Sequence, residues 1–166
     1  DCRRALWLSL LGGASAGITY GAHGVWNWET GKLEGGFAFG EGFLKALPHD
    51  LGIHFAGAED FAYAKRLVEH LGLYELEPAQ EVLTTRADEV FAAKTADGET
   101  LVVYVPTNAS FRLAGDWTGA HLRAIDLSSR YVLPLDAAYD VEKDETLIQQ
   151  STYLEDAVYI AEVPVA

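Results

Sequence analysis

A change of residue pattern at Pro78 is the strongest constraint on what this 166-residue chain can fold into. Before it, two apolar segments predict helices, over residues 2–11 and 59–71. After it, short apolar runs alternate with turn residues, which is typical of an antiparallel β-sandwich. The sequence therefore predicts two structural units, residues 1–78 and residues 79–166.

The first predicted helix opens an uncharged stretch that runs from Ala5 to Trp28. A membrane-spanning helix needs about 20 apolar residues, but glycines recur through this stretch and lower its helical propensity. We therefore expect no membrane span. Instead, the sequence predicts a buried helix, covered on all sides, that ends at Gly12-Gly13, then a short strand over residues 17–20 and a loop.

The second predicted helix has clear end signals. Acidic residues occupy its first turn, His70 lies in its last turn, and Gly72 follows as a stop residue. Between the two helices, residues 30–42 are rich in glycine and predict a loop. Residues 43–47 predict a helical turn that ends at Pro48.

Turn residues divide the rest of the chain into short strands. The Asp97-Gly98 pair is typical of a tight hairpin turn, and Gly115 marks a later turn. Strands of this length and spacing favour half-buried sheets packed face to face. The expected strands are residues 90–95, 101–105, 109–113, 121–126, 130–135, 146–150 and 158–163.

Composition argues against several classes of partner and cofactor. With 12 Lys and Arg against 25 Asp and Glu, the formal net charge is -13, which repels nucleic acid. The one cysteine, Cys2, cannot form an intrachain disulfide, and no Cys/His cluster has the spacing of a zinc site, so we expect no cofactor. We interpret the loop aspartates as turn residues rather than calcium ligands. These are Asp97, Asp116, Asp136, Asp140 and Asp144.

Residues 17–28, with the sequence GITYGAHGVWNW, are similar to a segment of the apiosidase-like glycoside hydrolases. Those enzymes are (β/α) barrels that carry a small C-terminal β-sandwich. Residues 3–14 resemble the helix between the last two barrel strands of that family. Residues 57–58, which open a helix, and residues 73–78 resemble the exit from the barrel. Residues 156–160 resemble the final strand of the sandwich.

The resemblance implies a mixed fold class, the end of a TIM (β/α)8 barrel followed by a small antiparallel β-sandwich. It implies that the chain is the C-terminal part of a glycoside hydrolase that acts on plant-type oligosaccharide or polysaccharide. Its partners would be the carbohydrate substrate and the upstream portion of the barrel, which would supply both catalytic carboxylates. We therefore assign no catalytic residue in this chain and expect the chain alone to be inactive. The compartment stays open, with a secreted or periplasmic parent protein favoured.

Trp26 and Trp28 are the first candidates for sugar contact. If the segment is extended, residues two apart project to the same side, and an exposed indole face can stack on the C–H face of a sugar. The alternative is that both rings fill the core, where large aromatic residues usually lie. The resemblance favours sugar contact, above all for Trp26 near the end of the last barrel strand, where barrel enzymes build their sites.

Tyr20, His23 and Glu29 complete the predicted sugar-binding set. Tyr20 and His23 offer polar rings to a sugar, but a strand tyrosine or a loop histidine equally forms structural hydrogen bonds. Glu29 is the nearest acid and suits the binding of sugar hydroxyls, although a solvated loop carboxylate is the simpler interpretation. Glu34 and Glu41, in the glycine-rich loop, are weaker candidates.

Two alternative hypotheses stay open. Residues 3–16 have the form of a signal peptide, with two arginines, an apolar run and a small-x-small site. In that case the chain is a non-catalytic secreted β-sandwich that binds carbohydrate or protein, and Trp117, Tyr131 and Tyr139 become candidate contacts. The other hypothesis is an accessory sandwich that only stabilises a neighbouring barrel.

Overall fold

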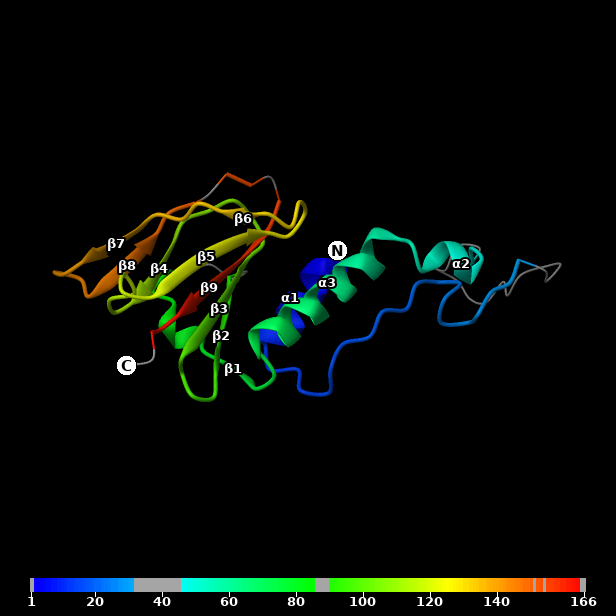
Figure 1. Ribbon diagram of the computed structural model, residues 1–166, viewed down its shortest axis with the longest axis horizontal. Coiled ribbons are helices and arrows are strands. Elements are labelled where there is room, and N and C mark those ends of the chain that lie inside the picture. The colour runs from blue at the N-terminus through cyan, green and yellow to red at the C-terminus, as the bar shows by residue number, and fades with distance from the viewer. Residues whose placement is uncertain (1, 32–45, 86–89, 151, 154, 165–166) are drawn as a thin grey trace.

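Two helices and two sheets form three layers, from which one segment protrudes (Figure 1). Helices α1 (Cys2–Leu11) and α3 (Ala56–Leu71) pack against one face of a six-stranded sheet, and a three-stranded sheet covers the other face. Residues 21–31 and the short helix α2 (His49–Gly52) extend beyond these layers (Figure 1). The computed structural model describes residues 2–31, 46–85, 90–150, 152–153 and 155–164.

All neighbouring strands in the two sheets are antiparallel, and the sheets form the sandwich-like arrangement that the turn spacing predicts. The larger sheet has the order β1 (Leu76–Pro78), β2 (Phe91–Thr95), β3 (Thr100–Val105), β9 (Ala157–Glu162), β5 (His121–Asp126), β6 (Val132–Leu133). The smaller sheet has the order β4 (Phe111–Ala114), β8 (Glu145–Ile148), β7 (Ala137–Asp140). A 3-10 helix, η1 (Gln80–Val82), follows β1.

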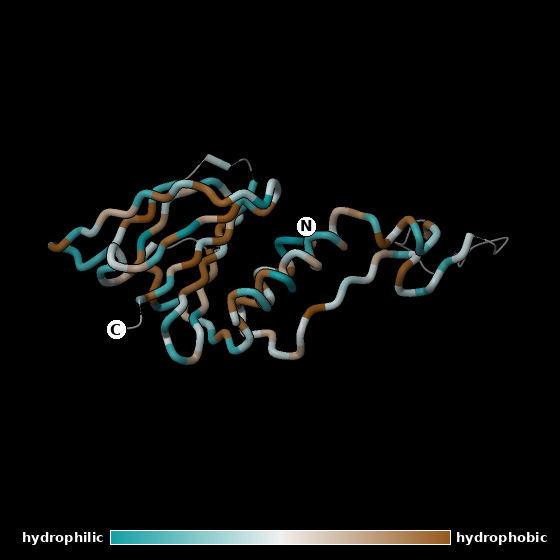
Figure 2. Tube along the Cα trace, viewed as in Figure 1, coloured by the Kyte–Doolittle hydropathy of each residue, from teal (hydrophilic) through white to brown (hydrophobic). Residues whose placement is uncertain are grey.

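Strand β3 explains why the larger sheet is the middle layer. Leu101 and Val103 pack with Phe111 in the core between the two sheets. Val102 and Tyr104 alternate with them and pack in a second core, against α1 and α3. Because side chains alternate along a strand, a strand that is apolar at every position can be buried on both faces. Figure 2 shows hydrophobic residues recurring along these strands and along the helices.

Helix α1 has the bounds that the sequence predicts. The Gly12 N–H donates to the Leu8 carbonyl at 2.9 Å, and the helix ends there as expected. The expectation that the helix is covered on all sides is wrong, because it lies on the surface of the sheet and exposes Ala5 and Ser9. Its buried side chains, which make it part of the folded core, are Leu6, Trp7 and Leu11.

The second helix and its surroundings differ slightly from the prediction. Helix α3 begins at Ala56, three residues before the predicted start, and ends before Gly72 as predicted. Pro48 precedes α2 instead of ending a helical turn, because proline fits the start of a helix better than its interior. Residues 43–45 of that predicted turn, and residues 32–42 of the predicted loop, lie outside the described residues.

The structure corrects the strand predictions in three ways. Residues 17–20 form no strand, since no described strand lies beside them to exchange hydrogen bonds. Strands β1 and β7 were not predicted, because one is a three-residue edge strand that contains Pro78 and the other has the weak pattern Ala-Ala-Tyr-Asp. Strand β6 is shorter than predicted and stops before Pro134.

Two of the loop aspartates bind within their own turns, as the sequence predicts. Asp97 accepts hydrogen bonds from the Thr95 hydroxyl at 2.6 Å and from the Glu99 N–H at 2.9 Å. Asp116 accepts the N–H of Thr118 at 2.9 Å. Each carboxylate serves the backbone of its own turn.

Arg3 fastens α1 to the sheet. Its guanidinium bonds to both carboxylate oxygens of Asp156, at 2.6 to 3.0 Å, and Asp156 also accepts the Tyr104 hydroxyl at 3.0 Å. Burial lowers the pKa of Arg3, but the bonds to Asp156 outweigh this and raise it. The predicted units thus share a core and a partly buried ion pair, and their boundary at residue 78 stays a prediction. Parallel strand pairs, which define a barrel, do not occur in the described residues, so the barrel end also stays a proposal.

Candidate functional site

Tyr20 attaches the protruding segment to the helices. Its hydroxyl donates to the Gly52 carbonyl in α2 at 3.3 Å. Its ring meets Phe61 of α3 edge to face, with 5.7 Å between the ring centroids. Burial raises the pKa of Tyr20, so the hydroxyl stays protonated as a donor. The structure therefore gives this residue a positioning contact on both helices.

Residues 22–29 form a tight loop instead of an extended strand. The Val25 N–H donates back to the Ala22 carbonyl at 2.8 Å. Glycine is required at position 24, because its φ is 114° and a Cβ there would lie 1.9 Å from the carbonyl oxygen of Leu47. The extended geometry that would project both indoles to the same side is therefore absent from this loop.

A histidine ring lies against each indole of the loop. His23 lies 5.5 Å from Trp26 between ring centroids, with the planes 13° apart. His49 lies 4.2 Å from Trp28, with the planes 22° apart. Trp26 and Trp28 are still 60% and 67% exposed, so neither ring fills the core. The loop thus presents two supported aromatic surfaces to solvent.

Glu29 is only 5% exposed, so the expectation of a solvated loop carboxylate is wrong. Its Oε1 accepts the Gly31 N–H at 2.7 Å, and its backbone carbonyl accepts both the N–H and the Nδ1–H of His49, at 2.7 and 2.8 Å. Trp28 has φ 51°, a left-handed conformation that costs a non-glycine residue about 1–3 kcal/mol. The chain reverses here, so that an exposed indole is followed by a buried carboxylate.

Two buried polar atoms of this loop lack a hydrogen-bond partner among the described residues. They are Nδ2 of Asn27 and Oε2 of Glu29. The amide oxygen of Asn27, Oδ1, is used, since it accepts the Gly24 N–H at 2.8 Å. An unsatisfied buried polar atom costs about 1–3 kcal/mol, and bound water or a ligand hydroxyl can meet the need. The loop therefore offers one donor and one acceptor from residues that alternate with the two tryptophans.

Sequence reasoning missed His49. It lies 20 residues beyond Glu29, after the glycine-rich loop, and no spacing rule connects the two residues. The one local signal is Pro48 directly before it, which marks the start of a helical turn. The weaker acid candidates Glu34 and Glu41 lie outside the described residues.

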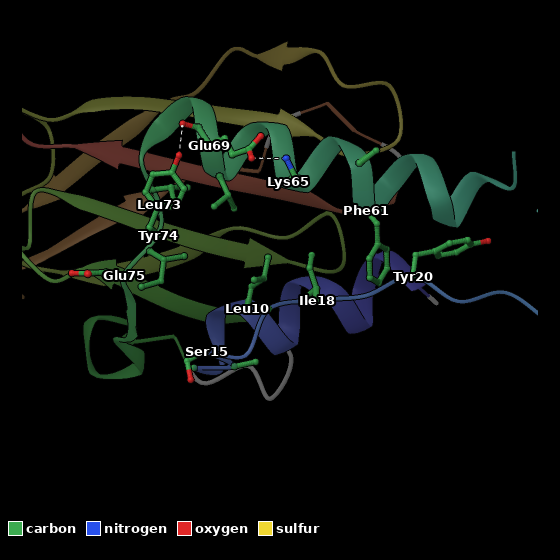
Figure 3. A pocket seen from close by; sticks show the side chains of 16 residues that line it. Leu10, Ser15, Ile18, Tyr20, Phe61, Lys65, Glu69, Leu73, Tyr74 and Glu75 are labelled. Carbon is green, nitrogen blue, oxygen red and sulfur yellow. Dashed lines mark hydrogen bonds and ion pairs between the residues drawn. The ribbon is translucent and has the colours of Figure 1, made fainter. Parts of the chain in front are cut away.

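A groove of about 650 Å³ lies between α1, α3 and residues 13–20 (Figure 3). Leu10, Ile18 and Phe61 line it with apolar side chains, and Tyr20 lies at one end. The backbone of residues 17–20, which borders the groove, makes no backbone hydrogen bond within the described part of the chain. The groove and the open backbone beside it form one unpartnered surface.

Buried acids elsewhere in the chain are already bound. Asp156 is held by Arg3 and Tyr104, and Asp126 accepts hydrogen bonds from its own turn. Glu29 is thus the one buried carboxylate of the described loop, whereas glycoside hydrolysis needs two carboxyl groups. Over the described ranges, no group of three or more metal-ligating side chains occurs.

The alternative contacts on the sandwich do not form one site. The Trp117 indole N–H donates to the Ala114 carbonyl at 2.9 Å, and the Tyr139 hydroxyl donates to Asp144 at 2.7 Å. Tyr131 is 74% exposed and lies in the connection between β5 and β6 of the other sheet. No observation brings these three aromatic residues together.

Residues 1–75, which include α1, α3 and all five predicted sugar contacts, match the family model of the apiosidase-like catalytic domain. A solved structure of a glycoside hydrolase matches 98% of this chain with a TM-score of 0.70 and 18% sequence identity. Over residues 1–75 this chain is similar to the apiosidase-like glycoside hydrolases. The predicted resemblance to that family is therefore confirmed.

The structural match to a glycoside hydrolase shows a shared fold, and this chain spans 36% of the length of that protein. The match extends over the helices and both sheets, so the layered arrangement described above also occurs there. No curated protein matches the sequence. The activity and substrate of this chain are accordingly proposals.

Proposed function

We propose that this chain is the C-terminal part of a glycoside hydrolase acting on plant-type oligosaccharide or polysaccharide, and that it contributes a sugar subsite. The subsite consists of Tyr20, His23, Trp26, Trp28 and Glu29. The observation that carries the proposal is the pair of exposed, histidine-supported indoles in the segment related to the apiosidase-like catalytic domain.

The chemistry of these rings suits a sugar. The indole face carries negative charge density, which attracts the weakly positive C–H groups on the apolar face of a pyranose or furanose. A single hydroxyl both donates and accepts, so sugar hydroxyls can satisfy the amide donor of Asn27 and the carboxylate acceptor of Glu29. Aromatic surfaces combined with a few polar groups are the usual composition of a small-molecule site.

Catalysis would need groups from outside this chain. Hydrolysis of a glycosidic bond uses one carboxylic acid to protonate the leaving oxygen and a second carboxylate as nucleophile or base. The described residues of the loop offer one buried carboxylate, Glu29. We assign both catalytic carboxylates to the upstream portion of the protein, so residues 1–166 alone are inactive.

The groove supports an upstream barrel portion as the partner of this chain. Its lining includes the apolar side chains of Leu10, Ile18 and Phe61, and residues 17–20 beside it have an open backbone that a neighbouring strand would pair. The solved glycoside hydrolase has nearly two thirds of its length outside the match, enough for the rest of a barrel. In this assignment residues 1–78 are the C-terminal part of a barrel and residues 79–166 are its accessory sandwich.

Removal of the exposed indoles tests the proposed subsite. In the complete protein, Trp26→Ala and Trp28→Ala should each weaken binding of plant cell-wall oligosaccharides, including one with a terminal apiose, about two- to tenfold by titration calorimetry. Tyr131→Ala removes an equally exposed aromatic ring from the sandwich and is the matched control. Unchanged affinity in both tryptophan variants would refute the subsite, and a loss confined to Tyr131→Ala would favour the sandwich-binding alternative.

A further inference from the structure

We infer that His49 is a positioning residue of the sugar site, because it fixes the indole of Trp28 in place. The inference rests on the proposed function, because the ligand is taken to be a sugar. The contact between His49 and Trp28 is observed in the structure itself. His49 lies in α2, on the far side of the glycine-rich loop from Trp28. The site is thus assembled from two separate segments of the chain.

The ring contact covers one face of the Trp28 indole. The ring centroids are 4.2 Å apart and the planes differ by 22°, which is a stacked geometry. Trp28 is nevertheless 67% exposed. One indole face is therefore occupied by the imidazole, and the exposed surface that is left can receive a sugar ring.

The orientation of the imidazole is set by the backbone of the residue after Trp28. Nδ1 of His49 lies 2.8 Å from the Glu29 carbonyl oxygen, and the His49 backbone N–H donates to the same oxygen at 2.7 Å. A carbonyl oxygen only accepts, so Nδ1 carries a proton and donates it. Two bonds to one carbonyl fix both the main chain and the ring of His49.

Helix α2 is itself seated firmly on the loop. A Cβ on Gly52 would lie 2.7 Å from a methyl group of Val25, and the Gly52 carbonyl accepts the Tyr20 hydroxyl. The loop and α2 are therefore packed against each other. An exposed tryptophan side chain loses rotational freedom when it binds a ligand. A histidine that restricts Trp28 beforehand lowers this entropic cost of binding.

Three substitutions separate the ring contact from the hydrogen bond. His49→Phe keeps a flat ring against Trp28 and removes the donor, His49→Asn keeps a donor and removes the ring, and His49→Ala removes both. His54→Ala, an exposed histidine five residues further along the same segment, is the matched control. The complete protein is labelled with 5-fluorotryptophan, and Trp28→Phe identifies the fluorine signal of Trp28.

The inference predicts that His49→Ala and His49→Asn shift the Trp28 fluorine signal and weaken oligosaccharide binding about two- to tenfold. His49→Phe should keep the affinity within about twofold of the unmodified protein, and His54→Ala should change neither signal nor affinity. A Trp28 signal that stays unchanged in every His49 variant would overturn the inference, whatever the protein binds.

Failure of the proposed function has a different signature. If the unmodified protein binds no oligosaccharide of the panel while His49→Ala still shifts the Trp28 signal, the sugar site is refuted and the positioning contact stands. If the signal shifts and binding is unchanged by His49→Ala, the contact exists but does not position Trp28 for a ligand, and the inference is wrong.

Discussion

At the scale of single residues, burial has placed two carboxylates in very different surroundings. Glu29 has one oxygen bonded to Gly31 and one without a partner among the described residues. Asp126 is also buried, but it accepts hydrogen bonds from Ser128 and Ser129 at 2.7 to 2.9 Å. The first arrangement leaves an acceptor for a ligand, and the second closes a turn.

The hydrogen bonds of Asp126 predict a pH-dependent contribution to stability. Burial raises the pKa of this carboxyl, but the bonds from Ser129 and Ser128 outweigh it and hold the pKa below its usual value. A folded-state pKa below the unfolded value of about 3.9 stabilises the fold above that pH, and the gain is lost as the pH falls through the folded-state pKa.

Asp126→Asn should therefore lower the free energy of unfolding by about 1–3 kcal/mol near pH 7, and by less near pH 3. Urea unfolding at both pH values measures this difference. Asp116→Asn is the control, because Asp116 makes the same kind of turn bond to Thr118 at the exposed surface, and its effect should be smaller. A loss that is equal at the two pH values would contradict the account of Asp126.

At the scale of elements, the ion pair between α1 and the β9 end of the large sheet joins the helical layer to the sandwich. The side chains of Arg3 and Asp156 are 18% and 6% exposed, and the Tyr104 hydroxyl donates to the same carboxylate. Burial and the negative charge of Asp156 raise the pKa of Tyr104, so this hydroxyl stays protonated. The helix that precedes the loop of residues 22–29 is therefore anchored in the sheet.

Breaking this pair leaves a buried carboxylate without its cation, which is strongly destabilising. Arg3→Met should lower the free energy of unfolding by about 3 kcal/mol. Glu155→Gln removes an exposed partner of the same guanidinium and should cost less than about 1 kcal/mol. Urea unfolding midpoints compare the two variants, and equal losses would show that Asp156 is not the dominant partner.

The sequence predicts elements well where local signals and packing agree. Helix α1 and strand β5 have the predicted bounds. A glycine pair ends the helix, and polar and apolar residues alternate at the start of the strand. Strand β1 and the His49 contact depend on partners distant in the chain, so no local pattern reveals them. The burial of Glu29 was missed for the same reason, since the loop closes on residues 47–49.

At the scale of the whole molecule, the chain combines a well-packed sandwich with an incompletely covered helical side. The inner strands of the large sheet, β2, β3, β9 and β5, each have a hydrogen-bonded strand on both sides. Residues 17–20, in contrast, pair with no strand within the described residues. The groove of about 650 Å³ lies on this same side. The loop of residues 22–29, which carries the proposed sugar subsite, therefore follows directly on the segment beside the surface that the upstream barrel portion is proposed to cover.

The central claim is that this chain completes a glycoside hydrolase whose catalytic carboxylates lie elsewhere in the protein. The most direct test is to compare hydrolysis of the oligosaccharide panel by the full-length protein and by residues 1–166 at equal molar concentration. The account predicts hydrolysis by the full-length protein and none by residues 1–166. Equal rates for the two, or no hydrolysis by the full-length protein, would contradict it.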